Sequence, residues 1–479
     1  MFKKNYKIKL GFAPTRRSLA GEKAFNKSEA NKFKDIIEEK LKAYGTDYVN
    51  LNFLNGEGLL YSGLDVDKVA QKFISEGVDA IFAPHCNFGT EDAVAKLAKR
   101  MNLPLLIWGP RDDKPDEEGY RYRDSQCGMF ATTKLLLRMG VPFTYITNCS
   151  VDDPLFARCF ENFMRAASAV KALRNPRIGQ ISIRPDVFWS VKCNEGELLE
   201  RFGIEIVTMT LPEFKKRFEA VQKENKDEIS AIVEKMKSTV SKVNFGEEYL
   251  SRIAALEMAV LNWAEDEGLT AAASQCWAPM YDVTGLAPCV AFSELTEVGL
   301  PTICEVDIHG AITSLMVQAA AMGQSSTFFA DVTIRHPSND NAELFWHCGV
   351  FPKSLAKDGI KPELCIHYNR KAPAVNHLEL KGGDITIARF DGARGEYSLL
   401  MGHGRGTTGP KTFGSYAWIE FNDWPLWEHK FIYGPYIHHC TGVHGKFAPA
   451  LYEACRYIPG LKPDPVEPTA QEIEKYLRG

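Results

Sequence analysis

Two acidic residues, Glu305 and Asp331, each follow a run of apolar residues and could share one ion. Glu305 ends an apolar strand at residues 300–304 and precedes a helix predicted over residues 307–322. Asp331 ends or interrupts a strand that begins at residue 326. In a strand–helix–strand unit the carboxyl ends of the two parallel strands lie close together. Because a buried carboxylate without a partner is costly, the pattern predicts a cation between the two acids.

A second interpretation needs no ion, since Glu305 could cap the following helix and Asp331 could pair with Arg335. The histidines favour the metal site. Ten of the eleven lie between His309 and His444, in less than a third of the chain. Imidazole is a common metal ligand, so this clustering is a modest indication of a metal site in the same region.

Composition limits the class of protein. A chain of 479 residues is expected to form two or three domains. The net charge of -4 argues against nucleic-acid binding. The sequence has no apolar run near the ~20 residues that a membrane span needs, and its apolar start is too short for a signal peptide. We therefore expect a cytoplasmic protein that does not bind membranes. Its twelve cysteines form no CxxC pair, which excludes a zinc knuckle.

The elements needed to position these residues follow from the hydrophobic pattern. Strand and helix signals alternate through residues 1–150 and again through 151–340, which predicts two parallel-sheet, Rossmann/flavodoxin-like α/β domains, the second carrying the acidic ligands. From residue 341 to 479, short alternating runs separated by Gly and Asp predict an antiparallel β domain that carries the histidine ligand. The first strand is not followed by GxGxxG, so nicotinamide chemistry is not expected.

Four segments, in order along the chain, resemble a known family. The segment CEVDIHGA at residues 304–311 resembles the metal-binding strand–helix junction of the L-fucose isomerase and L-arabinose isomerase superfamily. The segment FFADV at 328–332 resembles its second acidic strand, and YGPYIHH at 433–439 its C-terminal histidine motif. The opening GFAPTRR at 11–17 is similar to fucose-isomerase-like proteins. The resemblance implies an aldose–ketose isomerase.

The resemblance also implies a ligand set. A Mn²⁺ or similar divalent ion would be held by Glu305, Asp331 and His439. Adjacent residues on a strand point to opposite faces, so His438 and His439 are not expected to bind the same ion easily, and His438 stays open as a metal or substrate contact. His347 stands where arabinose isomerases carry a further histidine ligand. Ala330 stands where those enzymes use a glutamate, which favours the fucose-isomerase side of the superfamily and leaves His347 open as a metal or substrate contact.

Substrate contacts are expected from two regions. Gln275 and Trp277 follow a strand of the second α/β domain, and Gln275 is similar to a sugar-contacting glutamine of the family. Arg16 resembles an arginine that reaches the far end of the sugar, and Asn87 and Phe88 could cover the site of a neighbouring subunit in a trimer or hexamer. Alternatively, Arg16 is a solvated loop charge, and Trp277 and Phe88 are core aromatics.

The implied chemistry moves a proton between C1 and C2 of a sugar through an enediol. Glu305 and Asp331 would serve both as metal ligands and as proton carriers. A metal-dependent hydrolase or lyase acting on a sugar derivative could use the same ligands, and a non-catalytic sugar-binding protein is a further alternative. The sequence leaves the sugar open among L-fucose, D-arabinose, L-arabinose and an anionic hexose such as a sulfosugar, whose sulfonate Arg16, Arg17 and Arg111 could bind.

Overall fold

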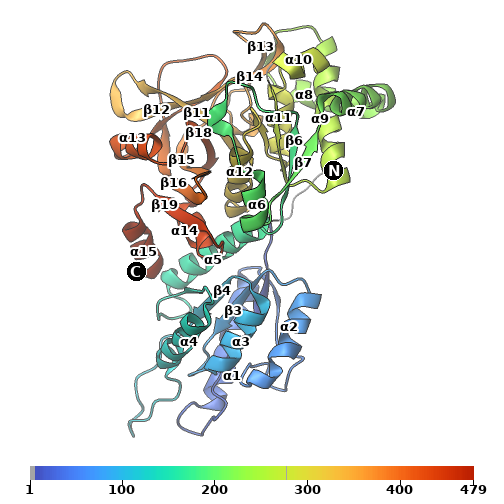
Figure 1. Cartoon of the computed structure of the whole chain (residues 1–479). Helices are drawn as coiled ribbons and strands as arrows, with labels where there is room; N and C mark the ends of the chain where they lie inside the picture. Colours follow the sequence, from blue (N-terminus) through green and yellow to red (C-terminus); the bar gives the residue numbers. More distant parts are fainter. Residues whose placement is uncertain (1–5, 277) are drawn as a thin grey trace. The chain divides into compact units, whose positions relative to one another are not determined.

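The computed structural model of the chain describes residues 6–276 and 278–479, which form two compact units (Figure 1). The N-terminal unit contains Tyr6–Lys171, joined by Glu453–Ile458 and Gln471–Gly479. The main unit contains Ala172–Tyr452 and Pro459–Ala470. The division into three domains at residues 150 and 340 stays a prediction.

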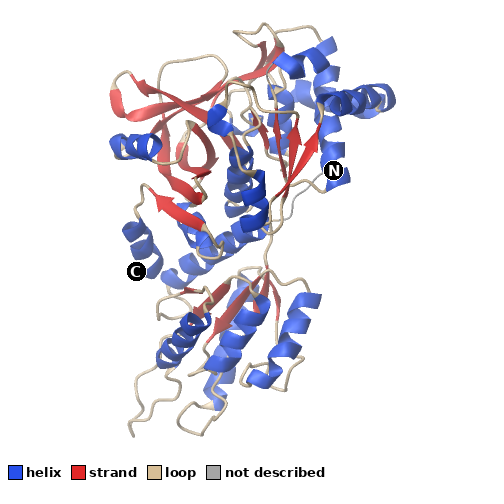
Figure 2. Cartoon of the chain, viewed as in Figure 1, coloured by secondary structure: helices blue, strands red, loops and turns tan. Residues whose placement is uncertain are grey.

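The N-terminal unit is a five-stranded parallel sheet with helices on both faces, in the order β2-β1-β3-β4-β5 (Figure 2). Its strands are β1 (Lys9–Phe12), β2 (Asp47–Val49), β3 (Ala80–Pro84), β4 (Leu105–Trp108) and β5 (Thr144–Tyr145). Its helices are α1 (Lys27–Ala43), η1 (Gly63–Asp65), α2 (Val66–Ser75), α3 (Glu91–Met101), α4 (Ser125–Met139), α5 (Pro154–Ala172) and α15 (Ala470–Arg478). Side chains alternate across these strands, so one face packs on α1 and α5 and the other on α2, α3 and α4.

The main unit begins with a second parallel sheet, in the order β10-β9-β6-β7. Its strands are β6 (Arg177–Ile181), β7 (Glu205–Met209), β9 (Ala271–Ser274) and β10 (Thr302–Cys304). The helices around it are η2 (Trp189–Val191), α6 (Glu195–Phe202), α7 (Leu211–Glu224), α8 (Lys226–Thr239), α9 (Glu248–Glu267), α10 (Ala278–Thr284), α11 (Cys289–Glu297) and α12 (Ile308–Ala320). All thirteen residues of α12 are buried, so this helix lies in the core between the sheet and the strands that follow.

The rest of the main unit is a closed antiparallel barrel. The ladder runs β16-β15-β18-β11-β12-β17, and a further pairing of β17 with β16 closes the ring. These strands are β11 (Thr327–His336), β12 (Asn339–His347), β15 (Gly383–Ala393), β16 (Glu396–Thr407), β17 (Ser415–Glu420) and β18 (His439–His444). The sheet is extended beyond the ring by β8 (Lys242–Val243), β13 (Glu363–Ile366), β14 (Pro373–Glu379) and β19 (Leu461–Pro465). The remaining helices are η3 (Lys353–Leu355), α13 (Trp424–Tyr433) and α14 (Ala448–Cys455).

The mixed α/β class, the parallel sheets and the C-terminal antiparallel domain are confirmed, and the Rossmann/flavodoxin-like label of the sheets stays a prediction. One expectation about the second unit is wrong. Asp331 does not end a parallel strand next to β10, because the chain leaves the parallel sheet through α12 and enters the barrel at β11. Within the described residues, no helix is long and apolar enough to cross a membrane.

Candidate active site

Glu305 lies at a strained turn between β10 and α12. Glu305 and Val306 have φ values of 66° and 56°, in the left-handed region, which a β-branched residue such as valine rarely adopts. Each such residue costs on the order of 1–3 kcal/mol and persists only where the surrounding structure imposes it. The helix is capped instead by Asp307, whose carboxylate accepts the Gly310 N–H at 2.9 Å. The Glu305 carboxylate is therefore not the cap of α12.

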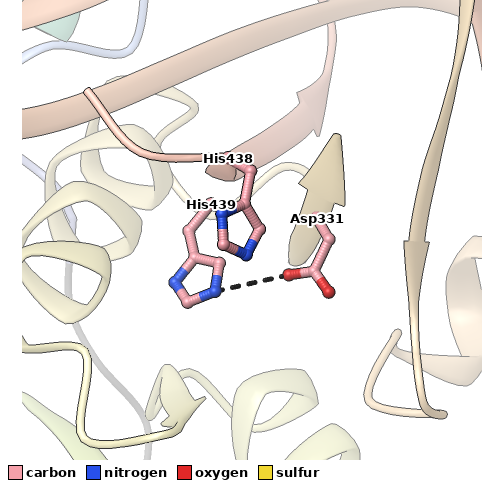
Figure 3. Close-up of side chains that lie close together, drawn as sticks. All are labelled: Asp331, His438 and His439. Carbon is pink, nitrogen blue, oxygen red and sulfur yellow. Dashed lines mark ion pairs between the residues drawn. The ribbon is translucent and has the colours of Figure 1, made fainter. Parts of the chain in front are cut away.

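Asp331 and His439 are brought together by the register of the barrel. The two residues are direct partners on the antiparallel strands β11 and β18, so their side chains leave the sheet on the same face. Strand β18 begins at His439, which places His438 before the strand, where alternation of side chains does not apply. One ligand atom from each of Asp331, His438 and His439 lies within 4.8 Å of the others (Figure 3). Strand alternation therefore does not separate His438 from His439 here, and which of the two would bind a metal stays a prediction.

Two of the residues predicted as metal ligands, Glu305 and Asp331, lie beside one ring nitrogen of the third, His439. His439 Nε2 lies 3.3 Å from Glu305 Oε2 and 3.4 Å from Asp331 Oδ1. Asp331 Oδ1 is buried and has no hydrogen-bond partner among the described residues. The alternative partner Arg335 instead pairs with Glu343 and Glu428, each at 3.3 Å. Two carboxylates thus lie beside His439 Nε2, and the residues whose ligand atoms all lie close enough to share one ion are Asp331, His438 and His439.

A buried charged network, which the sequence did not reveal, holds His439 in place. Asp307 is fully buried, and its Oδ2 lies 2.8 Å from His439 Nδ1. The same carboxylate binds the guanidinium of Arg389 through both of its oxygens, and Arg389 Nε donates to Asp391 at 2.9 Å. Asp391 in turn accepts from His309 Nδ1 at 2.9 Å. Asp307 therefore fixes the proton of His439 on Nδ1 and leaves Nε2 facing Glu305 and Asp331.

The pKa values of the buried groups agree with a positive charge beside Glu305 and Asp331. Burial alone would lower the pKa of His439, but the carboxylates of Asp307, Glu305 and Asp331 raise it to about 10. For Asp307 the effect of burial is outweighed by Arg389 and His439, which hold its pKa well below the usual range. Burial and the charge of His439 lower the pKa of His438, which keeps that ring neutral. In the metal-free protein the proton on His439 thus takes the place of a positive charge that the carboxylates require.

Two neighbouring cavities open at these residues. One, of about 350 Å³, is lined by Glu305, Asp331, His438 and His439 together with residues of the 187–190 and 367–370 loops. The other, of about 320 Å³, also borders Glu305 and extends between His347, His367 and Arg370 over four cysteines, Cys276, Cys289, Cys304 and Cys348. The two share Glu305, Cys348, His367 and Arg370. Together they could hold a small polar molecule whose one end meets the acidic cluster.

The remaining predicted site residues of the main unit lie near these cavities or outside the described structure. Trp277 lies outside the described residues. Gln275 follows β9, and its Oε1 accepts the Ser182 hydroxyl at 2.8 Å. Gln275 is buried and is absent from the described residues that line the two cavities, although Cys276 beside it lines one of them.

Arg16, Asn87 and Phe88 lie in the N-terminal unit. The Arg16 guanidinium is buried, pairs with both oxygens of Glu57 at 2.7 and 3.1 Å, and stacks on Tyr61. It is not the solvated loop charge considered as the alternative. Asn87 is fully buried, and its Oδ1 accepts the Arg17 N–H at 2.8 Å. Phe88 is partly buried beneath the Arg17 guanidinium. These contacts fix the loop around residue 87, while any role in sugar binding stays a prediction.

Comparisons with known proteins give one consistent assignment. The family described as "Fucose/sulfoquinovose isomerase, N-terminal domain" matches residues 19–174. A sulfoquinovose isomerase of Alkalicoccus urumqiensis is 27% identical over 74% of this chain and 78% of its own length. The sulfoquinovose isomerase of Priestia aryabhattai is 28% identical over 68% of this chain and 71% of its own.

The D-allose-bound periplasmic solute-binding protein of Actinobacillus succinogenes 130z is 14% identical and covers 66% of this chain and 88% of its own. Its TM-score is 0.17, which is too low to indicate a shared fold.

Proposed function

We propose that this aldose–ketose isomerase of the fucose-isomerase-like family uses a divalent metal to isomerise a sulfonated aldose, sulfoquinovose. The observation that carries the proposal is the approach of Glu305 and Asp331 to His439 Nε2, at 3.3 and 3.4 Å, in a cavity of the main unit. The choice of substrate is supported by the names of the relatives, all of which are sulfoquinovose isomerases.

The donor set suits a hard or borderline divalent ion. Two carboxylates and an imidazole are ligands that Mn²⁺ accepts, and the family resemblance favours that ion. Glu305, Asp331 and His439 would hold it, and His438 is near enough to add a fourth ligand or to contact the sugar. When bound, the ion supplies a positive charge that orients two substrate oxygens and stabilises negative charge on the enediol.

The carboxylates of Glu305 and Asp331 would carry out the proton transfer. Glu305 reaches the site from the end of the parallel sheet and Asp331 from the barrel, so they can act on opposite sides of a bound sugar. One carboxylate takes the proton from C2 of the open-chain aldose while O1 gains a proton, which gives the enediol. Loss of the O2 proton and return of a proton to C1 then gives the ketose. Positioned acid–base groups of this kind contribute roughly 10²–10⁴-fold in rate.

Further contacts to the sugar are proposed for the other residues that the sequence predicts to bind substrate. Gln275, which follows β9, would contact the sugar, as would Trp277, which lies outside the described residues. Arg16, Asn87 and Phe88 would complete the site of a neighbouring subunit in a homo-oligomer, a trimer or hexamer. The buried Arg16–Glu57 pair gives this loop a defined conformation, which such a role requires.

The test is a panel of aldoses with metal control. We expect ketose formation from sulfoquinovose that is lost in EDTA and restored by Mn²⁺. L-Fucose, L-arabinose and D-arabinose should react more slowly. His336→Gln, a change at a histidine that lines neither described cavity, is the matched control for His439→Gln and should keep full activity. Full turnover after rigorous chelation, or in His439→Gln, would contradict the metal mechanism.

A further inference from the structure

The cavity of about 320 Å³ that borders Glu305 is also lined by side chains that can donate hydrogen bonds. Two buried histidines, His347 and His367, line it and are only 2% and 4% exposed. The Nε2 atom of each is buried without a hydrogen-bond partner in the part of the chain that the structure describes. Buried polar atoms are normally paired, so these two nitrogens indicate a missing partner that accepts hydrogen bonds or donates them.

The tautomer of His367 determines whether its Nε2 donates or accepts a hydrogen bond. His367 Nδ1 accepts the backbone N–H groups of Asn369 and Arg370, each at 3.2 Å. A backbone N–H can only donate, so Nδ1 must present its lone pair and the ring proton must reside on Nε2. Burial, together with the positive charge of Arg370 and the effect of His347, lowers the pKa of His367 to about 4, which keeps the ring neutral. His367 therefore offers one N–H donor to the cavity.

His347 has the same tautomer for the same reason. Its Nδ1 accepts the backbone N–H of Cys348 at 2.8 Å, so its ring proton also resides on Nε2. His439 is the opposite case, because its Nδ1 faces the Asp307 carboxylate and its Nε2 is the atom left for a metal. A protonated Nε2 cannot bind a cation, so this arrangement favours His347 as a substrate contact over a metal ligand.

Arg370 contributes a positive charge to the lining of both cavities. It lies in the turn between β13 and β14, which is closed by hydrogen bonds from His367 N to Ala372 O at 2.7 Å and from Lys371 N to His367 O at 3.0 Å. Among the described residues that line the two cavities, Arg370 is the one arginine or lysine, and it borders both. A guanidinium with two neutral N–H donors nearby matches a group that carries several anionic oxygens.

We propose that Arg370, His367 and His347 form the subsite for the anionic end of the sugar, with its C1–C2 end at Glu305, Asp331 and His439. The inference rests on the proposed function and deepens it, since it names residues that would select a sulfonated over a neutral aldose. The acidic cluster attracts cations and repels sulfonate, so an adjacent donor-only region gives the substrate a single orientation. A sugar phosphate has similar oxygens, and its binding distinguishes a sulfonate subsite from a general anion subsite.

The experiment compares Arg370→Gln with Arg405→Gln, a change at an exposed arginine of the barrel outside both cavities. Calorimetry on the Mn²⁺-loaded protein measures affinity for sulfoquinovose, glucose 6-phosphate and D-glucose, and a separate titration measures Mn²⁺ affinity. We expect Arg370→Gln to weaken sulfoquinovose binding about 10- to 100-fold, the range for a lost charged hydrogen bond. D-Glucose and Mn²⁺ affinity should stay within about twofold, and Arg405→Gln should match the wild type. His367→Phe, which removes a neutral donor, should weaken sulfoquinovose binding less.

The possible outcomes test the anion subsite and the proposed isomerase function separately. Equal sulfoquinovose affinity in Arg370→Gln and wild type overturns the subsite, as does an equal loss for D-glucose, whether or not the enzyme isomerises sulfoquinovose. If no aldose is turned over but methanesulfonate binds the wild type and not Arg370→Gln, the subsite stands and the proposed function fails. Should Arg370→Gln not fold, as judged by Mn²⁺ binding, Arg370→Lys replaces it. That variant keeps the charge and should lose an intermediate amount of affinity.

Discussion

The contact between Asp307 and His439 predicts a specific defect in metal binding. In Asp307→Asn the amide can turn its NH₂ toward His439 Nδ1, which would move the ring proton to Nε2, the atom that faces Glu305 and Asp331. Outer carboxylates of this kind typically affect metal affinity by 10- to 100-fold. We therefore expect Mn²⁺ binding to weaken by about 1.4–2.7 kcal/mol.

The control for this prediction is Asp391→Asn, because Asp391 pairs with the same arginine, Arg389, and does not contact His439. Both variants remove one partner of a fully buried guanidinium, so both should lose about 3–5 kcal/mol of unfolding free energy. Only Asp307→Asn should lose the metal affinity. Calorimetric Mn²⁺ titration of protein shown to be folded by circular dichroism is the assay. Equal Mn²⁺ affinity in the two variants would refute the reasoning.

Three further predictions concern other groups. Glu305→Gln should lower kcat by roughly 10²–10⁴-fold in a ketose assay at saturating Mn²⁺, and a smaller loss would mean that Glu305 carries no proton. Burial, and then the charge of the nearby Glu294, raise the pKa of Glu257 to about 7. Because this carboxyl ionises less readily in the folded protein, the wild type should lose about 3 kcal/mol of stability as pH rises from about 4.5 past 7. Glu257→Gln should remove that loss in urea titrations and leave stability below pH 4.5 unchanged, whereas equal pH profiles would contradict it. Gly128→Ala should destabilise by about 1–3 kcal/mol, because a Cβ there would lie 1.6 Å from the Phe88 carbonyl oxygen, whereas Gly196→Ala in α6 should be neutral or stabilising.

The parts of the site that follow from local sequence were predictable. Glu305 and Asp331 each end an apolar run, and the histidine clustering pointed to the same region. The place of Asp331 in the fold was not predictable in this way. A strand, a helix and a strand in succession favour a parallel unit, yet the second strand pairs with β12 and β18, which come later in the chain. Pairing with β12 is a local hairpin, but pairing with β18 joins segments far apart in the chain, and no local pattern specifies it.

The supporting network was also missed, although two signals were present. Asp307 stands three residues before Gly310 at the start of a predicted helix, the position of a capping carboxylate. Arg389 and Asp391 are two residues apart in a strand that is apolar around them, which places both on one face of the strand. Charged residues at that spacing inside an apolar strand indicate a buried ion pair. The tautomers of His347 and His367 could not be predicted, since they depend on backbone N–H groups that only the folded turns supply.

The pairing of Asp331 with His439 has a consequence for how the barrel reaches its native state. Sliding β11 past β18 by a single residue would turn Asp331 to the opposite side of the sheet and separate it from the imidazole. A divalent ion would then stabilise only the correctly aligned barrel, by an amount that grows with the logarithm of the free ion concentration. We therefore expect Mn²⁺ to favour the correct register of β11 and β18 during folding. The refolding yield should rise when Mn²⁺ is present from the start.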